Sequence, residues 1–271
     1  MNDGLADTFH ALHAGPDVLV LPNAWDAASA ALMADAGARA VATSSAAVAW
    51  AHGHPDGDAL PTDTLLAAIS EIVRVISVPL TADIEGGYTD DPDALARTVT
   101  AVIDAGAAGI NLEDGVRDPE LHARKLEAAR RAADRTGVRL FINARTDVYL
   151  HGLAEGEAAA NETLRRAELY RSAGADGIFV PWPTDAALIG RLAAAIALPM
   201  NVMSRAGVPP AAELQRLGVR RLSSATGMFR AAYAPLSAAI RAFLGHGDPS
   251  ALAAAGQGLA NLNERFAPRK P

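Results

Sequence analysis

Short apolar runs rich in β-branched residues alternate along this chain with longer Ala-, Leu- and Arg-rich segments of helical period. Eight of the short runs are predicted to be strands, at residues 18–22, 40–44, 78–83, 109–114, 139–144, 177–181, 198–202 and 220–224. Nearly continuous apolar strands, each followed by a helix, are typical of a parallel sheet that is covered on both faces. Eight such units predict an α/β fold of the TIM type, a (β/α)8 barrel.

A weak internal repeat supports this count of strands. The sequences AGARAV, AGAAGI, AGADGI and LGVRRL each end a helical segment on glycine and lead into the second, fourth, sixth or eighth predicted strand. Glycine at such a helix end adopts the left-handed conformation that caps the last turn. The four glycines are therefore interpreted as structural: Gly37, Gly106, Gly174 and Gly218.

The length of 271 residues suits one barrel with added helices. No linker rich in Pro, Gly or Ser separates the predicted units, so residues 1–271 are predicted to form a single (β/α)8 barrel domain. Residues 232–271 follow the eighth strand and are interpreted as a C-terminal helical extension. These helices exceed what one barrel needs to close, and exchange of a terminal helix between subunits favours symmetric oligomers. A tetramer or a dimer is expected.

Composition excludes several classes of function. The net charge of −7 and the absence of Lys and Arg clusters argue against binding to nucleic acid or to an acidic membrane surface. The absence of cysteine rules out disulfides, thiolate metal ligands and a cysteine nucleophile, and it agrees with a reducing compartment. The N-terminus has no export signal, and no apolar run reaches the ~18 residues of a membrane helix. A cytoplasmic protein is expected.

The active site of a TIM-type barrel lies at the C-terminal ends of its strands. Those ends are strongly polar here: Thr43 to Ser45, Asp83 and Glu85, Glu113 and Asp114, Asn143 and Arg145, Asn201, and Ser223 and Ser224. The loop after the second strand adds His52, His54 and Asp56. A hard divalent cation with an anionic oxygen ligand requires such carboxylates, with an arginine and hydroxyls opposite. Mg²⁺, with Mn²⁺ as an alternative, is therefore predicted at this end of the barrel.

Each of these groups also has an ordinary structural interpretation. Taken alone, Asp83 and Glu85 fit a solvated turn or a helix cap. A loop histidine such as His52 is more often solvated than a metal ligand. Arg145 could simply be an ion-pair partner of Asp147. Acidic ends on three separate segments of one barrel together favour the metal site over these separate explanations.

Four sequences, in order, resemble the isocitrate lyase and phosphoenolpyruvate mutase superfamily, specifically its small-chain branch: ATSSAAVAWAHGHPDG, TADIEGGY, GINLEDG and FINARTD. The resemblance extends from LPNAWDAASA to the eighth predicted strand. It implies a helix-swapped (β/α)8 barrel, usually a homotetramer. It also implies that Mg²⁺ and a 2-oxo or 2-hydroxy carboxylate bind there and that the reaction passes through an enolate-like intermediate.

The resemblance assigns the metal site to four carboxylates. Asp83 is similar to the direct Mg²⁺ ligand, and through the metal it also counts as a substrate-binding residue. Glu85 stands where the family usually has a second aspartate. Asp56 and Glu113 correspond to carboxylates that hold the water molecules of the metal.

The resemblance assigns the substrate site to a turn, an arginine and an amide. Ser44 corresponds to the serine that binds the substrate carboxylate, together with the backbone N–H groups of Ser45 and Ala46. Ser45 replaces the usual glycine. Arg145 corresponds to the arginine that contacts the carboxylate or phosphonyl group, and Asn201 to a polar substrate contact of the lyases. The predicted catalytic residues are Arg145, Asp56 and Glu113.

The sequence departs from the family pattern in two loops. Lyases that cleave isocitrate or methylisocitrate carry a cysteine in a KKCGH-like loop after the fourth strand, and the phosphonate mutases place Lys and Asn there. This chain has GVRDPELHARKL, with Arg117, Asp118 and Pro119. After the sixth strand, Pro181 and Trp182 stand where the family often has Glu or His. These departures weaken the case for either specific chemistry.

The shared electrostatic core still suits a small-molecule 2-oxo acid that forms an enolate. The predicted function is Mg²⁺-dependent C–C cleavage next to a 2-oxo acid, by decarboxylation or retro-aldol release. One alternative is phosphoenolpyruvate mutase, phosphonopyruvate or carboxyphosphonate chemistry at a P–C bond. Another is a non-catalytic protein that binds 2-oxo acids.

Overall fold

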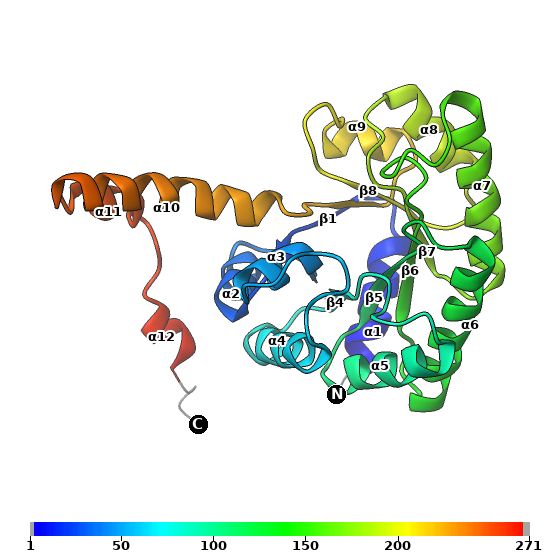
Figure 1. Ribbon diagram of the computed structural model, residues 1–271, viewed down its shortest axis with the longest axis horizontal. Coiled ribbons are helices and arrows are strands. Elements are labelled where there is room, and N and C mark those ends of the chain that lie inside the picture. Colours follow the sequence, from blue (N-terminus) through cyan, green and yellow to red (C-terminus); the bar gives the residue numbers. More distant parts are fainter. Residues whose placement is uncertain (1–2, 268–271) are drawn as a thin grey trace.

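The computed structural model describes residues 3–267, in which nine short strands form one parallel sheet. The strands are β1 (Leu19–Leu21), β2 (Asn23–Ala24), β3 (Val41–Thr43), β4 (Leu80–Asp83), β5 (Gly109–Glu113), β6 (Phe141–Arg145), β7 (Gly177–Phe179), β8 (Met200–Met203) and β9 (Arg221–Ser223). Their order is β1-β9-β8-β7-β6-β5-β4-β3-β2, so the two edge strands follow each other in the chain. The sheet therefore curls into a nearly closed barrel, which confirms the TIM-type fold (Figure 1).

The first predicted strand is divided into β1 and β2 at Pro22. Proline has no N–H group to donate to a neighbouring strand, so it interrupts the hydrogen-bonded ladder. Before this break, the carbonyl of Leu21 accepts from Ser224 beyond β9 at 3.1 Å, and at the break the carbonyl of Pro22 accepts from Ala42 of β3 at 2.9 Å. One bent strand thus joins both edges of the sheet. The other seven predicted strands are confirmed within two residues at each end.

Helices follow the strands on the outside of the barrel (Figure 1). They are α2 (Ala27–Asp35), α3 (Ser45–Ala51), α4 (Thr62–Val75), α5 (Pro92–Asp104), α6 (Pro119–Thr136), α7 (Gly156–Ser172), α8 (Ala186–Ala195) and α9 (Ala211–Arg216). At the N-terminal ends of the strands, α1 (Asp3–Ala14) inserts Phe9, whose ring lies 5.4 Å from that of Phe141. Within residues 3–267, no helix is long and apolar enough to cross a membrane.

The glycine repeat has the structural role that the sequence predicts. Gly37, Gly106, Gly174 and Gly218 have φ angles of 93°, 107°, 98° and 91°, in the left-handed region. Each directly follows the C-terminal capping residue of a helix, where a residue with a β-carbon would be strained. These turns return the chain to the strand that carries the next part of the site.

The barrel interior contains a layer of buried polar side chains beneath the polar strand ends. The Asn143 amide donates to Asn111 Oδ1 at 2.9 Å and to Asn201 Oδ1 at 3.2 Å. The buried Arg221 donates from Nη2 to Asn111 Oδ1 at 3.1 Å. These contacts link β5, β6, β8 and β9 into one layer under the site, in which Arg221 Nε and Nη1 have no hydrogen-bond partner among residues 3–267.

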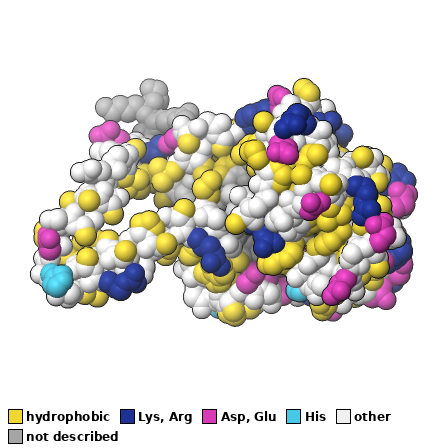
Figure 2. All heavy atoms as spheres, turned by 90° about the horizontal axis from the view of Figure 1, so that it is seen from above, with side chains coloured by type: hydrophobic (Ala, Val, Ile, Leu, Met, Phe, Trp, Pro, Cys, Tyr) yellow, Lys and Arg dark blue, Asp and Glu magenta, His cyan; other side chains and the backbone are white. Residues whose placement is uncertain are grey.

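The chain leaves the barrel after β9. Helices α10 (Gly227–His246), α11 (Ser250–Ala255) and α12 (Leu262–Phe266) follow, and α10 projects away from the barrel (Figure 1). The predicted start of the C-terminal extension at residue 232 falls inside α10. Figure 2 shows hydrophobic side chains along this projecting arm.

Candidate functional site

The C-terminal ends of β3, β4, β5 and β6 lie side by side because these strands are neighbours in the parallel sheet. The register aligns Asp83 with Asn111 and Glu113 with Arg145. Burial is the main cause that raises the pKa of Asp56, Glu85 and Glu113, and the nearby charge of Asp83 raises all three further. The fold therefore brings the four predicted metal-site carboxylates into one cluster.

Asp83 ends β4 and is buried, with 9% of its surface exposed. Its Oδ2 accepts from the Ser45 hydroxyl at 3.1 Å and from the Ser45 N–H at 3.4 Å. Its Oδ1 accepts from the N–H of Glu85 at 3.5 Å. These are long hydrogen bonds, and a carboxylate has about four acceptor positions. Asp83 thus keeps acceptor capacity for a cation.

Glu85 has a different arrangement from Asp83. Its backbone is left-handed, with φ of 52°, and its Oε2 accepts from the N–H groups of Gly57, at 2.8 Å, and Asp58. Its Oε1 accepts from the Tyr88 hydroxyl at 3.2 Å. Burial, and then the charges of neighbouring carboxylates, raise the pKa of Glu85 to about 7. Glu85 holds the loop that carries Asp56 beside Asp83, and its predicted place in the metal site stays a prediction.

Glu113 and Arg145 form an ion pair on neighbouring strands, with Oε2 and Nη1 at 2.6 Å. Burial raises the pKa of Glu113 to about 8 and, with the charges of Asp83, Asp147 and Glu85, outweighs the attraction of Arg145. Arg145 Nε also donates to Asp147 Oδ1 at 2.6 Å. The ion pair with Asp147 that the sequence allowed is therefore real, and Arg145 lies beside the acidic cluster as well.

The predicted substrate-binding residues lie at two different depths in the barrel. Ser44 caps α3, and its Oγ accepts from the N–H of Ala47 at 3.4 Å. Ser45 and Ala46 begin the same helix, next to Asp83. Asn201 lies lower, in the polar layer, where its Nδ2 donates to Val202 O at 2.6 Å. The substrate contacts of these four residues stay predictions.

Several residues that join the loops around the site were not predicted as a group. Arg117 donates to Asp58 at 2.8 Å and to Asp90 at 2.6 Å, which ties the loop after β5 to those after β3 and β4. The buried Lys125 donates to the carbonyl of Gly86. The sequence singled out Arg117 only as a departure from the family loop. Its partners lie 27 and 59 residues away, so local spacing gave no signal for them.

A strained aromatic residue follows β7. Trp182 has φ of 87°, which is rare for a bulky side chain and needs support from its surroundings. Arg205, which follows β8, donates to the Trp182 carbonyl at 2.9 Å and stacks 3.7 Å over its ring. The position where the family often has Glu or His therefore carries a cation–π pair at the same end of the barrel.

The donor set fits a cation that keeps most of its water. Within residues 3–267, no three His, Cys, Asp or Glu side chains converge closely enough to ligate one ion directly. Mg²⁺ is commonly bound by one or two carboxylates and several waters, so a single direct ligand with carboxylates around it suffices. Burial first, and then the nearby charge of Asp83, raise the pKa values of Asp56, Glu85 and Glu113, and a divalent cation would offset the repulsion among these carboxylates.

Comparison with known proteins places this chain in a family. Residues 9–244 match the phosphoenolpyruvate phosphomutase family. An uncharacterized protein of Mycobacterium tuberculosis is 36% identical over 84% of this chain and 87% of that protein. The 2-methylisocitrate lyase of Bacillus subtilis is 31% identical over 65% of this chain and 59% of its own length.

A solved structure of a phosphonomutase-like protein from Burkholderia cenocepacia matches with a TM-score of 0.85 and 42% sequence identity. The match covers 89% of this chain and 99% of that chain. The extent of these matches confirms the resemblance that the four sequence motifs carry. The chain therefore belongs to the phosphoenolpyruvate phosphomutase family, within the isocitrate lyase and phosphoenolpyruvate mutase superfamily.

Proposed function

We propose that this protein is a Mg²⁺-dependent enzyme that cleaves a C–C bond in a 2-oxo or 2-hydroxy carboxylic acid, with Mn²⁺ able to replace Mg²⁺. One observation carries the proposal: Asp83 lies in a cluster with three carboxylates of raised pKa, and Arg145 lies against that cluster. Such a site combines a cation-binding centre with a guanidinium for an anionic substrate. The relationship to a 2-methylisocitrate lyase supports cleavage at carbon.

Asp83 would hold the metal directly, and Asp56, Glu85 and Glu113 would hold its waters. The bound cation would act as a Lewis acid that stabilises negative charge on the oxygen of a 2-oxo acid. Arg145 would bind an anionic oxygen of the substrate, and the turn from Ser44 to Ala46 would bind its carboxylate.

Glu113 is the residue best suited to move a proton. Burial raises its pKa to about 8 in the metal-free protein, and its carboxyl lies 2.6 Å from Arg145. A carboxyl group with a pKa near the working pH can both donate and accept a proton. In this proposal Glu113 supplies or removes a proton near the anion-binding guanidinium. It would take the part that the resemblance assigns to a cysteine in the lyases that cleave isocitrate or methylisocitrate.

P–C bond chemistry is the second candidate, and the relationship to a phosphonomutase-like protein favours it. Arg117 stands in the loop where phosphonate mutases have Lys and Asn, and its side chain is engaged by Asp58 and Asp90. This arrangement weighs against that candidate. A protein that binds 2-oxo acids without turnover is the third possibility that an assay must separate.

The test is a panel of 2-oxo and 2-hydroxy mono- and dicarboxylates, incubated with the protein and Mg²⁺ and followed by NMR. The proposal expects carbon fragments to appear in the presence of Mg²⁺ and not in the presence of a chelator. Phosphonopyruvate belongs in the same panel, because release of phosphate from it would select P–C chemistry. Tight binding without any turnover across the panel would select the non-catalytic protein.

The stability of the metal-free protein should depend on the pH through Glu113. The folded-state pKa of about 8 lies above the ordinary carboxyl value, so the folded protein binds a proton that the unfolded chain has released. The resulting stability is complete below the ordinary carboxyl pKa and is lost as the pH rises through about 8. Lowering the pH from about 8.5 to about 6.5 should therefore add ~2 kcal/mol to the free energy of unfolding.

Urea unfolding in the presence of a chelator measures this difference. Other groups also titrate in this range, so the comparison is between the wild type and Glu113→Gln. The variant should lack the ~2 kcal/mol gain, because its amide does not titrate. Identical pH dependence in the two proteins would show that Glu113 has an ordinary pKa in the folded state.

We also propose that the protein is a homo-oligomer, a tetramer or a dimer, that works in the cytoplasm and exchanges α10 between subunits. Tyr233, Leu236, Ile240 and Phe243 recur at helical spacing on α10, with 41–44% of their surfaces exposed. An apolar groove of about 650 Å³ lies beside β1 and α2 and includes Val20, which is 57% exposed. Strands of a TIM-type barrel are normally covered by helices at this position, so α10 of a second copy fits the groove.

Light scattering should therefore give a mass that is a multiple of 28.0 kDa at micromolar concentration. Ile240→Asp should lower the mass toward that of one chain, because it places a charge in the proposed contact. Val116→Asp adds the same charge to an exposed apolar residue outside the groove and serves as the control. A wild-type mass of 28.0 kDa would exclude the assembly.

A further inference from the structure

Arg145 is held in place by carboxylates on two sides. Its Nη1 lies 2.6 Å from Glu113 on β5, and its Nε lies 2.6 Å from Asp147, two residues further along its own chain segment. Within residues 3–267, no hydrogen bond or ion pair engages Nη2, so this nitrogen can donate to a ligand. Glu113 belongs to the proposed metal site. Asp147 is the partner that lies outside that site.

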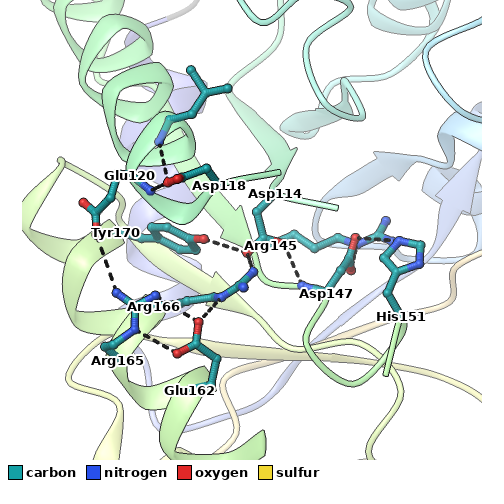
Figure 3. Close-up of polar contacts among 11 residues, drawn as sticks. Asp114, Asp118, Glu120, Arg145, Asp147, His151, Glu162, Arg165, Arg166 and Tyr170 are labelled. Atoms are coloured by element: carbon teal, nitrogen blue, oxygen red, sulfur yellow. Dashed lines mark hydrogen bonds and ion pairs between the residues drawn. The ribbon is translucent and has the colours of Figure 1, made fainter. Parts of the chain in front are cut away.

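Asp147 is in turn held in place by Asp114. Its side chain is fully buried, and its backbone N–H donates to Asp114 Oδ1 at 2.8 Å. Asp114 is also fully buried, and its Oδ2 accepts from Arg166 at 2.8 Å and from the Tyr170 hydroxyl at 2.6 Å. Figure 3 shows this chain of contacts running from α7 through Asp114 to Asp147 and Arg145.

The two adjacent acidic residues at the end of β5 therefore have different roles. Glu113 faces Arg145 at the site, whereas Asp114 points away from it, toward Arg166 and Tyr170 of α7. Because the pleat alternates side chains between the two faces of a strand, neighbouring residues point in opposite directions. The charge of Arg166 balances Asp114, which leaves the charge of Asp147 for Arg145.

We propose that Asp147 is the positioning residue for Arg145, and that Asp114, Arg166 and Tyr170 hold Asp147 in register. This inference rests on the proposed role of Arg145 in binding the substrate. A long arginine side chain loses rotamer freedom when it binds a ligand, and a fixed partner removes most of that cost in advance. Asp147 also orients the guanidinium plane, since its Oδ1 accepts from Nε while Glu113 lies against Nη1.

The test uses oxalate as the probe, because its planar dianion resembles the enolate of a 2-oxo acid. Calorimetry measures oxalate affinity in the presence of Mg²⁺, and Mg²⁺ affinity alone, for the wild type and Asp147→Asn. We expect oxalate affinity to fall about tenfold, the lower end of what residues supporting a ligand contact contribute. Mg²⁺ affinity should not change, and this split separates positioning from a general loss of structure.

Chemical rescue tests the same point without Arg145. In Arg145→Ala, guanidinium chloride below denaturing concentrations should restore part of the oxalate affinity, because Asp147 can still bind a free guanidinium ion where the Arg145 side chain lay. The double variant Arg145→Ala/Asp147→Asn should show no rescue. Arg145→Ala/Glu168→Gln is the matched control, since Glu168 is an exposed carboxylate of α7 that pairs with Arg171 and not with Arg166, and it should be rescued like the single variant.

Tyr170→Phe covers the case in which Asp147→Asn fails to fold. It removes one hydrogen bond to Asp114 and should weaken oxalate about fivefold, without changing Mg²⁺ affinity. Full oxalate affinity in Asp147→Asn and Tyr170→Phe, or equal rescue in the double variant, would overturn the inference. If the wild type shows no Mg²⁺-dependent oxalate binding, the proposed function itself fails. That result is distinct from the others.

Discussion

Asp83→Ala is expected to abolish binding of Mg²⁺ and Mn²⁺ and any activity that depends on them. Asp83 is the buried carboxylate whose contacts are long, at 3.1–3.5 Å, and it therefore retains acceptor capacity. Glu85, by contrast, already accepts from Gly57, Asp58 and Tyr88. If one direct ligand anchors the metal, its removal leaves only carboxylates that contact the metal through water.

Isothermal calorimetry with Mg²⁺ measures this effect. Asp83→Asn keeps the shape of the side chain and removes its charge, so it should also fail to bind, which separates loss of the ligand from loss of packing. Glu113→Gln should only weaken binding, by about 10- to 100-fold, because its contact is through water. Undiminished Mg²⁺ binding by Asp83→Ala would reject the assignment.

Arg145→Ala is expected to weaken Mg²⁺-dependent binding of 2-oxoglutarate by at least about tenfold. Loss of a buried, charge-assisted partner typically costs ~2 to 5 kcal/mol, and each 1.4 kcal/mol is about one decade in affinity. The Arg145 side chain is 16% exposed and is already engaged by Glu113 and Asp147, so it is preorganised for an anion. Arg145→Lys should restore little, because an ammonium group cannot keep both carboxylates and a ligand in one plane.

Affinity for a neutral ketone provides the control for charge. The wild type should bind 2-oxoglutarate and not the ketone, because the guanidinium and the metal both select an anion. The Arg145→Ala and Arg145→Lys variants should lose affinity for the acid alone. Equal affinity in all three proteins, or equal binding of the ketone, would remove Arg145 from the site.

Much of the fold followed from local patterns in the sequence. The glycines at Gly37, Gly106, Gly174 and Gly218 mark helix ends through their own backbone preference, and the apolar runs mark the strands. The break at Pro22 was not predicted, because it depends on which edge each half of the strand pairs with. The direction of α10 was also not predicted, since the helical period of a sequence does not show what the helix packs against.

The site was predictable in position and less so in contacts. A barrel places the ends of its strands together, so Asp83, Glu113 and Arg145 could be grouped from the sequence alone. The direction in which each carboxylate points depends on the fold. The Glu85 carboxylate points toward the loop that contains Gly57, and the Asp114 carboxylate points toward α7. Partners such as Tyr170, which lies 56 residues from Asp114, are brought into contact only by the tertiary structure.

A crystal structure with Mn²⁺ and oxalate tests the central claim most directly, because Mn²⁺ gives anomalous scattering that locates the ion. We predict one ion roughly 2 Å from an Asp83 carboxylate oxygen, with waters between it and the other acidic residues. Oxalate should bind to the ion and accept a hydrogen bond from Arg145. An ion bound elsewhere, or oxalate density away from Arg145 in a crystal with Mn²⁺ at Asp83, would contradict the account.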